Sequence, residues 1–302
     1  MNGILRVFPR RTSATPTDDL VRCQIVKGRH TGRGFPPPPD APRIACSEVH
    51  VSVAFTWDRP LAEDMLAAWR RAGYRSLIGG PAYGDMGEEF TPGLYLRTGH
   101  VITSRGCPNR CPNCLVPARE GPLRTLAVQP GWNVLDNNLL ACPEGHVRSV
   151  VRMLRLQTRP AEFTGGIEAA RLVRMPSFVK AVTSEIRLKV LFLAYDRPAE
   201  KPHVERAAKM LLDAGGWSAG TARKKVMCYV LAGYEGDQDE AAIEARFEWV
   251  KSLGITPFPM FFQGPTDRKD PRIEALKRRF RRWMRPSSIW SKKEPAAAPE
   301  SP

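Results

Sequence analysis

Strand-like and helix-like segments alternate along most of this 302-residue chain, and this alternation restricts the fold more than any other feature of the sequence. Unbroken apolar runs such as VLFLAY at 190–195 are typical of parallel strands that helices cover on both faces. The pattern predicts six strands, at 100–104, 132–141, 161–164, 186–195, 225–233 and 255–262. It predicts helices at 145–156, from about 167, at 204–216 and at 239–254.

Six strand–helix units are too few for a closed eight-stranded barrel. An open partial barrel and a doubly wound sheet both fit the pattern, and periodicity does not separate them. In either fold the functional site lies at the carboxyl ends of the strands.

The chain divides into three parts by pattern and composition. Residues 1–97 form a small α/β extension with strands at 49–55 and 74–80 around a helix at 61–71, and ILRVF at 4–8 suits a further strand. The rest of 1–47 shows little apolar periodicity. Residues 98–265 hold the six strands, and 266–302 contain a basic helix at 272–285 followed by a Pro/Ala-rich segment that we expect to be disordered.

The composition narrows the classes of function. Forty-six Lys and Arg against 31 Asp and Glu give a net charge of +15, which attracts phosphate-bearing partners. No apolar run has membrane-spanning length, and no leader-like segment is apparent. The seven cysteines are odd in number and three lie within eight residues, which argues against a secreted disulfide framework. We therefore expect a cytoplasmic protein without a membrane partner.

Cys107, Cys111 and Cys114 have the spacing C-x3-C-x2-C on a loop rich in Gly, Pro and Asn directly after a strand. Soft thiolates favour Zn, Cu(I) or iron–sulfur clusters. A structural zinc site needs four ligands, and Cys142 or His146 is available as the fourth, but neither forms a second close pair. A [4Fe–4S] cluster held by three cysteines leaves one iron open for a substrate or cofactor. The residues alone leave cluster, zinc and simple packing as alternatives.

The C-x3-C-x2-C loop after the first strand of a β–α series resembles the radical S-adenosylmethionine superfamily over about residues 98–265. The resemblance implies a partial (β/α)6 barrel, a [4Fe–4S] cluster on the three cysteines, and S-adenosylmethionine chelated to the open iron. It further implies that an electron, supplied by a reductant such as flavodoxin or ferredoxin, cleaves the sulfonium. The resulting 5′-deoxyadenosyl radical abstracts hydrogen from a substrate, which the sequence does not identify.

The resemblance also assigns contacts with S-adenosylmethionine after three of the strands. These residues are Asp136, Asn137, Asn138, Gly165, Gly166, Glu168, Arg171, Val230, Leu231 and Gly233. The polar residues at 136–138 bind the methionine amino group, the two glycines allow close backbone approach, and 230–233 lies against adenine. Glu168 binds the ribose hydroxyls or the amino group, and Arg171 binds the carboxylate. The same residues also suit an Asx turn, a glycine-rich turn before a helix, and ordinary strand core.

Two features depart from the family pattern. Asn113 stands before the third cysteine, where an aromatic residue is usual, and Gly-Gly-Glu-Pro is absent from the second strand. Cys23 and Cys46 are scattered, so no second cluster is expected, and Cys142 and Cys228 are predicted to be small buried hydrophobes.

The extension at 1–97 resembles the last part of a cobalamin-binding domain, but the Asp-x-His-x-x-Gly motif that supplies the lower cobalt ligand is missing. We expect a truncated cobalamin-binding-like extension that caps the barrel and binds no cobalamin, with an unrelated α/β unit as the alternative. The helix at 272–285 suits nucleic acid through its charge, whereas Phe280 and Trp283 suit packing against the barrel. The leading hypothesis is a radical S-adenosylmethionine enzyme, and the alternative is a zinc-stabilised nucleic-acid-binding module.

Overall fold

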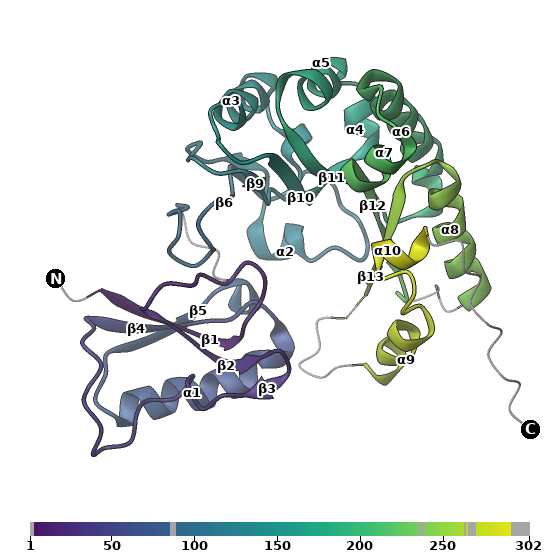
Figure 1. Cartoon of the computed structure of the whole chain (residues 1–302). Coiled ribbons are helices and arrows are strands. Elements are labelled where there is room, and N and C mark those ends of the chain that lie inside the picture. Colours follow the sequence, from purple (N-terminus) through teal and green to yellow (C-terminus); the bar gives the residue numbers. More distant parts are fainter. Residues whose placement is uncertain are drawn as a thin grey trace, which may run out of the picture.

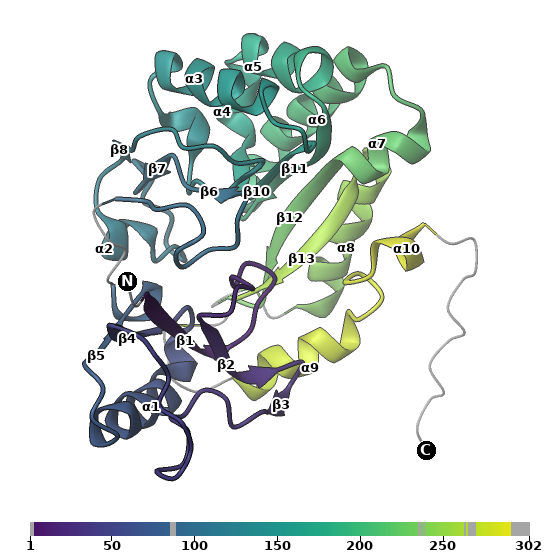
Figure 2. The ribbon, with the colours of Figure 1, turned by 60° about the vertical axis from the view of Figure 1, so that its left-hand side comes forward.

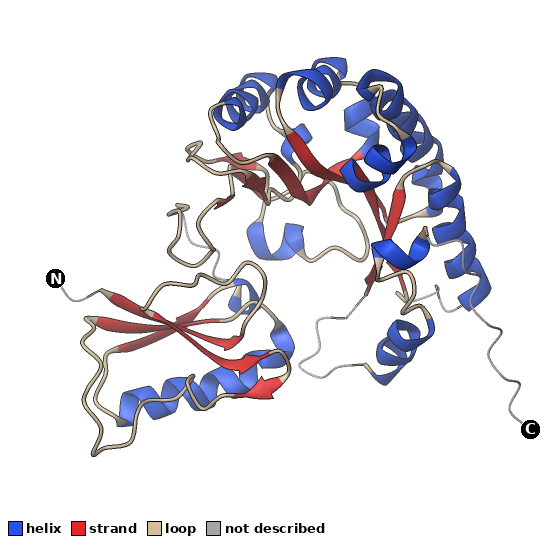
Figure 3. Cartoon of the chain, in the orientation of Figure 1, coloured by secondary structure: helices blue, strands red, loops and turns tan. Residues whose placement is uncertain are grey.

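A computed structural model of the chain describes residues 3–84, 89–234, 237, 239–262, 264 and 270–290. Within these residues it contains two larger, mainly parallel sheets, a short two-stranded sheet, and helices packed on them (Figures 1 and 3). The protein is therefore a mixed α/β fold, as the alternation predicts. None of the described helices is long and apolar enough to span a bilayer.

The first sheet comes from residues before 80, and its described strands lie in the order β3-β2-β1-β4-β5. These are β1 (Ile4–Arg10), β2 (Val21–Val26), β3 (Arg29–His30), β4 (Glu48–Ser52) and β5 (Ser76–Gly79). Only the β2–β3 pair is antiparallel. Helix α1 (Arg59–Arg71) covers one face, starting with a proline in its first turn and ending before Gly73, whose φ is +77°.

In the second sheet all pairs of neighbouring described strands are parallel, and the strands lie in the order β13-β12-β11-β10-β9-β6. Its strands are β6 (His100–Val101), β9 (Asn133–Val134), β10 (Ala161–Glu168), β11 (Leu188–Tyr195), β12 (Val226–Ala232) and β13 (Thr256–Phe261). Pro257 and Pro259 are tolerated because β13 lies at the edge of this sheet. The short hairpin pairs β7 (Ser104–Arg105) with β8 (Arg124–Thr125).

Helices connect the strands and cover the sheet, and Figures 1 and 2 show α3, α6 and α8 along its outer side. The α-helices after α1 are α2 (Val116–Glu120), α3 (Glu144–Arg155), α4 (Ala169–Val173), α5 (Pro176–Lys180), α6 (Lys201–Gly215), α7 (Ala219–Lys225), α8 (Glu240–Ser252), α9 (Pro271–Arg279) and α10 (Pro286–Ile289). Short 3-10 or π turns are η1 (Thr56–Asp58), η2 (Pro81–Tyr83), η3 (Leu139–Ala141), η4 (Ala181–Glu185) and η5 (Pro198–Glu200).

Each of the two larger sheets has its own hydrophobic core. The first core joins β1 and β4 to α1 through Leu5, Val7, Val49, Met65 and Trp69. The second core joins the six-stranded sheet to its helices, and the apolar stripes of α3 and α8 are buried in it. The buried cores explain why these amphipathic segments fold as helices.

The C-terminal part differs from the prediction. The predicted helix at 272–285 ends at Arg279, and Phe280 and Trp283 are buried against Phe247 at ring distances of 5.5 and 5.4 Å. The prediction of disorder is wrong for residues 287–290, where Trp290 stacks on a guanidinium 3.8 Å away. Residues 291–302 lie outside the described part of the chain.

Other differences concern the strands. The prediction omits β2, whose residues VRCQI alternate apolar and polar side chains over only five positions and whose centre is buried. The predicted strand at 161–164 continues to Glu168, so the helix after it begins at Ala169 rather than near 167. The first predicted strand of the second sheet is split, because Ser104 and Arg105 pair with β8 instead.

Candidate functional site

The loop with the three cysteines runs from β7 to α2 at the carboxyl end of the six-stranded sheet. Gly106 starts it with φ +75°, and a Cβ there would lie 2.2 Å from the carbonyl oxygen of Pro122, so only glycine fits. The backbone N–H of Cys114 donates to the carbonyl of Cys111 over 3.1 Å, which closes a turn between two of the cysteines. All three thiols are free; Cys107 and Cys111 are half-buried and Cys114 is exposed.

The three thiols influence one another electrostatically. Although Cys114 as a whole residue is exposed, the protein atoms around its thiol desolvate it and raise its pKa, and the neighbouring Cys107 raises it further. Burial also raises the pKa of Cys111, with Cys114 adding to the effect. Among the described residues, however, no group of three or more His, Cys, Asp or Glu side chains is arranged to hold a metal ion. The donor set suits a thiophilic metal or an iron–sulfur cluster, and binding would require the loop to draw the thiols together.

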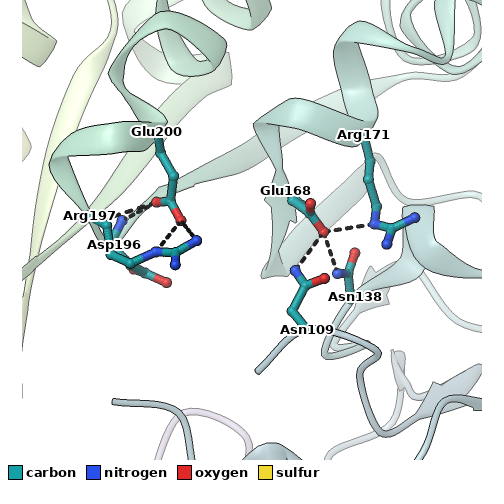
Figure 4. A network of polar contacts seen from close by, with 7 residues as sticks. All are labelled: Asn109, Asn138, Glu168, Arg171, Asp196, Arg197 and Glu200. Carbon is teal, nitrogen blue, oxygen red and sulfur yellow. Dashed lines mark hydrogen bonds and ion pairs between the residues drawn. The ribbon is translucent and has the colours of Figure 1, made fainter. Parts of the chain in front are cut away.

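A cluster of polar side chains around Glu168 lies beside this loop (Figure 4). The Oε2 atom of Glu168, at the end of β10, accepts hydrogen bonds from Asn138 Nδ2 at 2.6 Å, Asn109 Nδ2 at 2.9 Å and Arg171 Nε at 2.8 Å. Burial alone would raise the pKa of Glu168, but these three donors outweigh it and lower the pKa. The carboxylate is therefore held in its charged form at the edge of the cysteine loop.

Asn138 connects this cluster to the cysteines. Its Nδ2 also lies 3.5 Å from the Sγ atom of Cys107. The side chain is 4% exposed, and its Oδ1 atom is buried with no hydrogen-bond partner among the described residues. A buried amide oxygen without a donor is costly, and it marks a place where a ligand N–H or O–H can bind.

Asp136, predicted to contact the methionine amino group, points elsewhere. Its carboxylate accepts hydrogen bonds from the backbone N–H and the hydroxyl of Thr103, both at 2.6 Å, and from the hydroxyl of Ser104 at 2.7 Å. Burial raises its pKa despite these bonds, and the side chain is 2% exposed. Asp136 therefore fixes the strand before the cysteine loop. His146 Nε2 lies 3.2 Å from the Thr103 hydroxyl in the same network.

Asn137 also supports the cysteine loop. Its Nδ2 donates to Oε2 of Glu120 over 2.6 Å, and the same oxygen accepts from the backbone N–H of Gly106 at 3.4 Å. Arg105 forms an ion pair with this carboxylate at 3.8 Å. The buried Glu120, on α2, thus ties the two ends of the loop together, which the sequence did not indicate.

The two glycines predicted after the third strand lie within β10. A Cβ on Gly165 would lie 2.4 Å from the carbonyl oxygen of Asp136, so glycine allows β10 to approach the end of β9 closely. Gly166 has φ +92°, a conformation that favours glycine. The close approach at Gly165 is with the chain's own backbone, and the approach of this segment to S-adenosylmethionine stays a prediction.

The segment predicted to lie against adenine ends β12. Val230 is fully buried in the core. Gly233 has φ +80°, and a Cβ there would lie 2.8 Å from Leu276 and 2.9 Å from Ile273, both on α9. Its backbone N–H donates to Asp237 over 3.1 Å. Val230 and Gly233 therefore share none of the contacts described for the Glu168 cluster. Helix α9 packs over Gly233.

A second polar group, which the sequence reading missed, follows β11 (Figure 4). The backbone N–H groups of Asp196 and Arg197 donate to Glu200 at 2.8 and 3.1 Å, and the guanidinium of Arg197 also binds this carboxylate. Arg197 lowers the pKa of Cys111, whereas Asp196 and Glu200 raise it, so this group lies near the cysteine loop. The sequence D-R-P-A-E after a strand is a capping pattern that could have indicated it.

Burial and the charge of Glu200 raise the pKa of Asp196 from 3.8 to about 6, with Arg197 opposing them. Cys142 and Cys228 are 5% and 0% exposed, so the prediction that both are buried is confirmed.

No model of a known protein family matches this sequence, and no curated protein matches it either.

Proposed function

We propose that this protein is a radical S-adenosylmethionine enzyme whose [4Fe–4S] cluster is held by Cys107, Cys111 and Cys114. The observation that carries the proposal is the position of Asn138, which contacts both Cys107 and the Glu168 carboxylate. One buried amide thus joins a three-cysteine loop to an ionised polar cluster. A ligand that binds an open iron through its amino and carboxylate groups needs both a three-cysteine loop to hold the iron and charged side chains beside it to bind those two groups.

The order of the strands supports a partial (β/α)6 barrel. From β6 to β13 the strands lie side by side in chain order, without the reversal that a doubly wound sheet has. The helices that follow β9 to β12 pack on the outer side, as in a barrel wall (Figure 2). In such a barrel the carboxyl-terminal edge of the six-stranded sheet carries the cysteine loop, Asn138, Glu168 and Asp196.

Within this proposal the chain's own groups bind and orient S-adenosylmethionine. Glu168, kept ionised by its three donors, accepts hydrogen bonds from the methionine amino group, and Arg171 binds the methionine carboxylate. The free Oδ1 of Asn138 accepts a further hydrogen bond from the amino group. When bound, the cluster supplies the electron for cleavage of the sulfonium. A reductant such as flavodoxin or ferredoxin in the cytoplasm provides that electron, and the substrate is not identified.

Metal content tests the ligand assignment. We expect anaerobically reconstituted protein to be brown and to hold about four irons per chain. The Cys111→Ala variant should lose this iron, whereas Cys46→Ala, which removes another half-buried thiol, should keep it. A colourless protein with about one zinc per chain would instead support the zinc-stabilised module. Full iron content in Cys111→Ala would disprove the assignment.

The role of Glu168 needs a separate measurement. Reduced, cluster-loaded protein should convert S-adenosylmethionine to methionine and 5′-deoxyadenosine. Glu168→Gln should weaken S-adenosylmethionine binding by about ten- to a hundredfold, because a hydrogen bond to a charged group is worth about 1.5–3 kcal/mol. Glu162→Gln is the matched control, since Glu162 lies on the same strand and pairs with Lys189 at 2.9 Å. Equal affinity in the two variants would disprove this role.

The structure gives no observation that favours nucleic-acid binding by the C-terminal basic segment. Phe280 and Trp283 are 0% and 2% exposed, so neither ring offers a face for base stacking. Arg279 and Arg282 form ion pairs with glutamates of α8. We therefore propose no second function.

A further inference from the structure

The first sheet carries a cavity of about 420 Å³ that the proposed chemistry does not use. Phe8, His50 and Leu77 line it from β1, β4 and β5. Because side chains alternate along a strand and Val7, Val49 and Val51 belong to the core under α1, these three lining residues lie on the opposite face. Residues 89–96 line the same cavity from the connection between the two larger sheets.

The position of the cavity follows a general rule for parallel sheets. From β1 the chain passes to β2 on one side and later returns to β4 on the other side, so the direction of winding reverses between β1 and β4. Ligands of open α/β sheets bind outside the carboxyl ends of the strands at such a reversal. Phe8 and Arg10 from the end of β1 and Ser52 from the end of β4 line the cavity there.

The lining is mostly apolar and partly open to solvent. Phe8, Phe55, Phe90, Leu77 and Tyr95 contribute rings or aliphatic groups. Among the described residues only five large hydrophobic side chains are exposed, and two of them, Leu77 at 47% and Tyr95 at 38%, lie in this one cavity. Apolar side chains that gather in a concave site favour a ligand with apolar surface.

The two arginines of the lining are already compensated by carboxylates. Arg10 donates two hydrogen bonds to Asp58, at 3.0 and 2.7 Å, and Arg105 faces Glu120 at 3.8 Å. Glu89 is exposed to solvent. An anionic ligand would lose its hydration in this cavity without gaining a free counter-charge, which is costly, and the solvent-exposed Glu89 offers a cation only a screened one.

Polar groups suited to an uncharged ligand are also present. The Tyr95 hydroxyl lies 2.5 Å from His50 Nδ1, and Ser52 places a second hydroxyl in the lining. At about 30 Å³ for each water, the volume corresponds to roughly fourteen waters. That is room for a ring system of two fused or linked rings with a short substituent.

We infer that this cavity is a binding site for an uncharged, flat, mainly aromatic small molecule with one or two hydrogen-bonding groups. The site is built by the first sheet and the connecting segment, and it requires neither metal nor S-adenosylmethionine. Arg105, two residues before Cys107, forms part of its wall, so the ligand binds next to the cysteine loop. The inference is independent of the proposed function.

The test uses the full chain as purified, without reconstitution. N-phenyl-1-naphthylamine is an uncharged two-part aromatic probe whose fluorescence rises in apolar sites, and 8-anilino-1-naphthalenesulfonate carries the same rings with an anionic group. We expect saturable binding of the uncharged probe at one site per chain and at least tenfold weaker binding of the anionic one. Leu77→Trp, which fills the cavity, should weaken binding of the uncharged probe at least tenfold.

Leu156→Trp is the matched control, because Leu156 is 79% exposed on the other part of the chain and does not line the cavity. Far-ultraviolet circular dichroism establishes that both variants are folded. Equal probe binding in the two folded variants would overturn the inference, and equal affinity for the two probes would overturn its uncharged ligand class. Hydroxocobalamin, whose corrin is much larger than the cavity, should not displace the probe; competitive displacement would overturn the assigned ligand size.

Discussion

Replacing Asp196 with Asn should stabilise the protein at neutral pH and leave its stability near pH 4 almost unchanged. The carboxyl group follows β11, where burial and the charge of Glu200 raise its pKa from 3.8 to about 6. A raised pKa means that the folded state prefers the protonated acid. The stabilising contribution is complete below about pH 3.8 and is lost as the pH rises through about 6.

The magnitude follows from the two pKa values. Their difference corresponds to about 3 kcal/mol in the free energy of unfolding, at about 1.4 kcal/mol for each pH unit. Asp196 retains part of its surface in water, so screening reduces this value and we expect roughly half of it. The substitution keeps the backbone N–H that donates to Glu200, so the turn itself is preserved.

Urea unfolding at intervals from pH 4.5 to 7.5, followed by circular dichroism, measures the effect. The gap between variant and wild type should open as the pH rises and level off above about pH 7. Asp213→Asn is the control, since its carboxylate is 64% exposed and pairs with Lys209 on the surface of α6. A gap for Asp196→Asn that is independent of pH would refute the reasoning.

Three further substitutions probe packing, and urea unfolding measures each. Phe247→Ala should lose about 3–5 kcal/mol of stability, because the ring is fully buried against two other aromatic rings; a loss below about 1 kcal/mol would contradict this packing. Gly165→Ala should destabilise by about 1–3 kcal/mol because its Cβ would collide with the backbone of Leu135 and Asp136 just after β9. Its control Gly220→Ala, in an open helical position, should stabilise slightly. Trp290→Ala should lower the free energy of unfolding by about 1–2 kcal/mol, and Trp290→Phe should lower it less, because only the alanine variant removes the ring over Arg223. Equal losses in the two variants would show that the hydrogen bond to Thr256, which both remove, dominates.

Segments with a strong period were predicted well because their burial is simple. Helix α3 and strand β11 bury their apolar residues as expected, one as a stripe and the other on both faces. Strand β2 was missed although residues 21–25 alternate apolar and polar side chains, because the alternation is short and would place Gln24 on a solvent face, whereas Gln24 is buried and accepts a hydrogen bond from the backbone N–H of Gly34. A polar side chain with a distant partner gives no signal in a local pattern.

The tail shows the opposite error. Residues 287–290 begin a segment with the polar, proline-rich composition of a disordered tail, yet Ile289 is buried in the second core, and Trp290 stacks on a guanidinium from α7 and donates to the hydroxyl of Thr256. Two apolar side chains are enough to anchor these four residues. Composition averages over a window and cannot report one such anchor.

The turn after β9 shows how far sequence reasoning reaches into the site. Three adjacent polar residues were assigned to one ligand, but their side chains take three directions. Asp136 turns inward to Thr103, Asn137 binds Glu120, and only Asn138 reaches the cysteine loop. The buried network beneath the loop requires an acceptor from this turn, and β10 can lie close to it only because residue 165 is glycine. The pattern therefore indicated a polar turn that the structure places beside the cysteine loop, whereas the contact that each of its side chains makes depends on partners that lie tens of residues away in the chain.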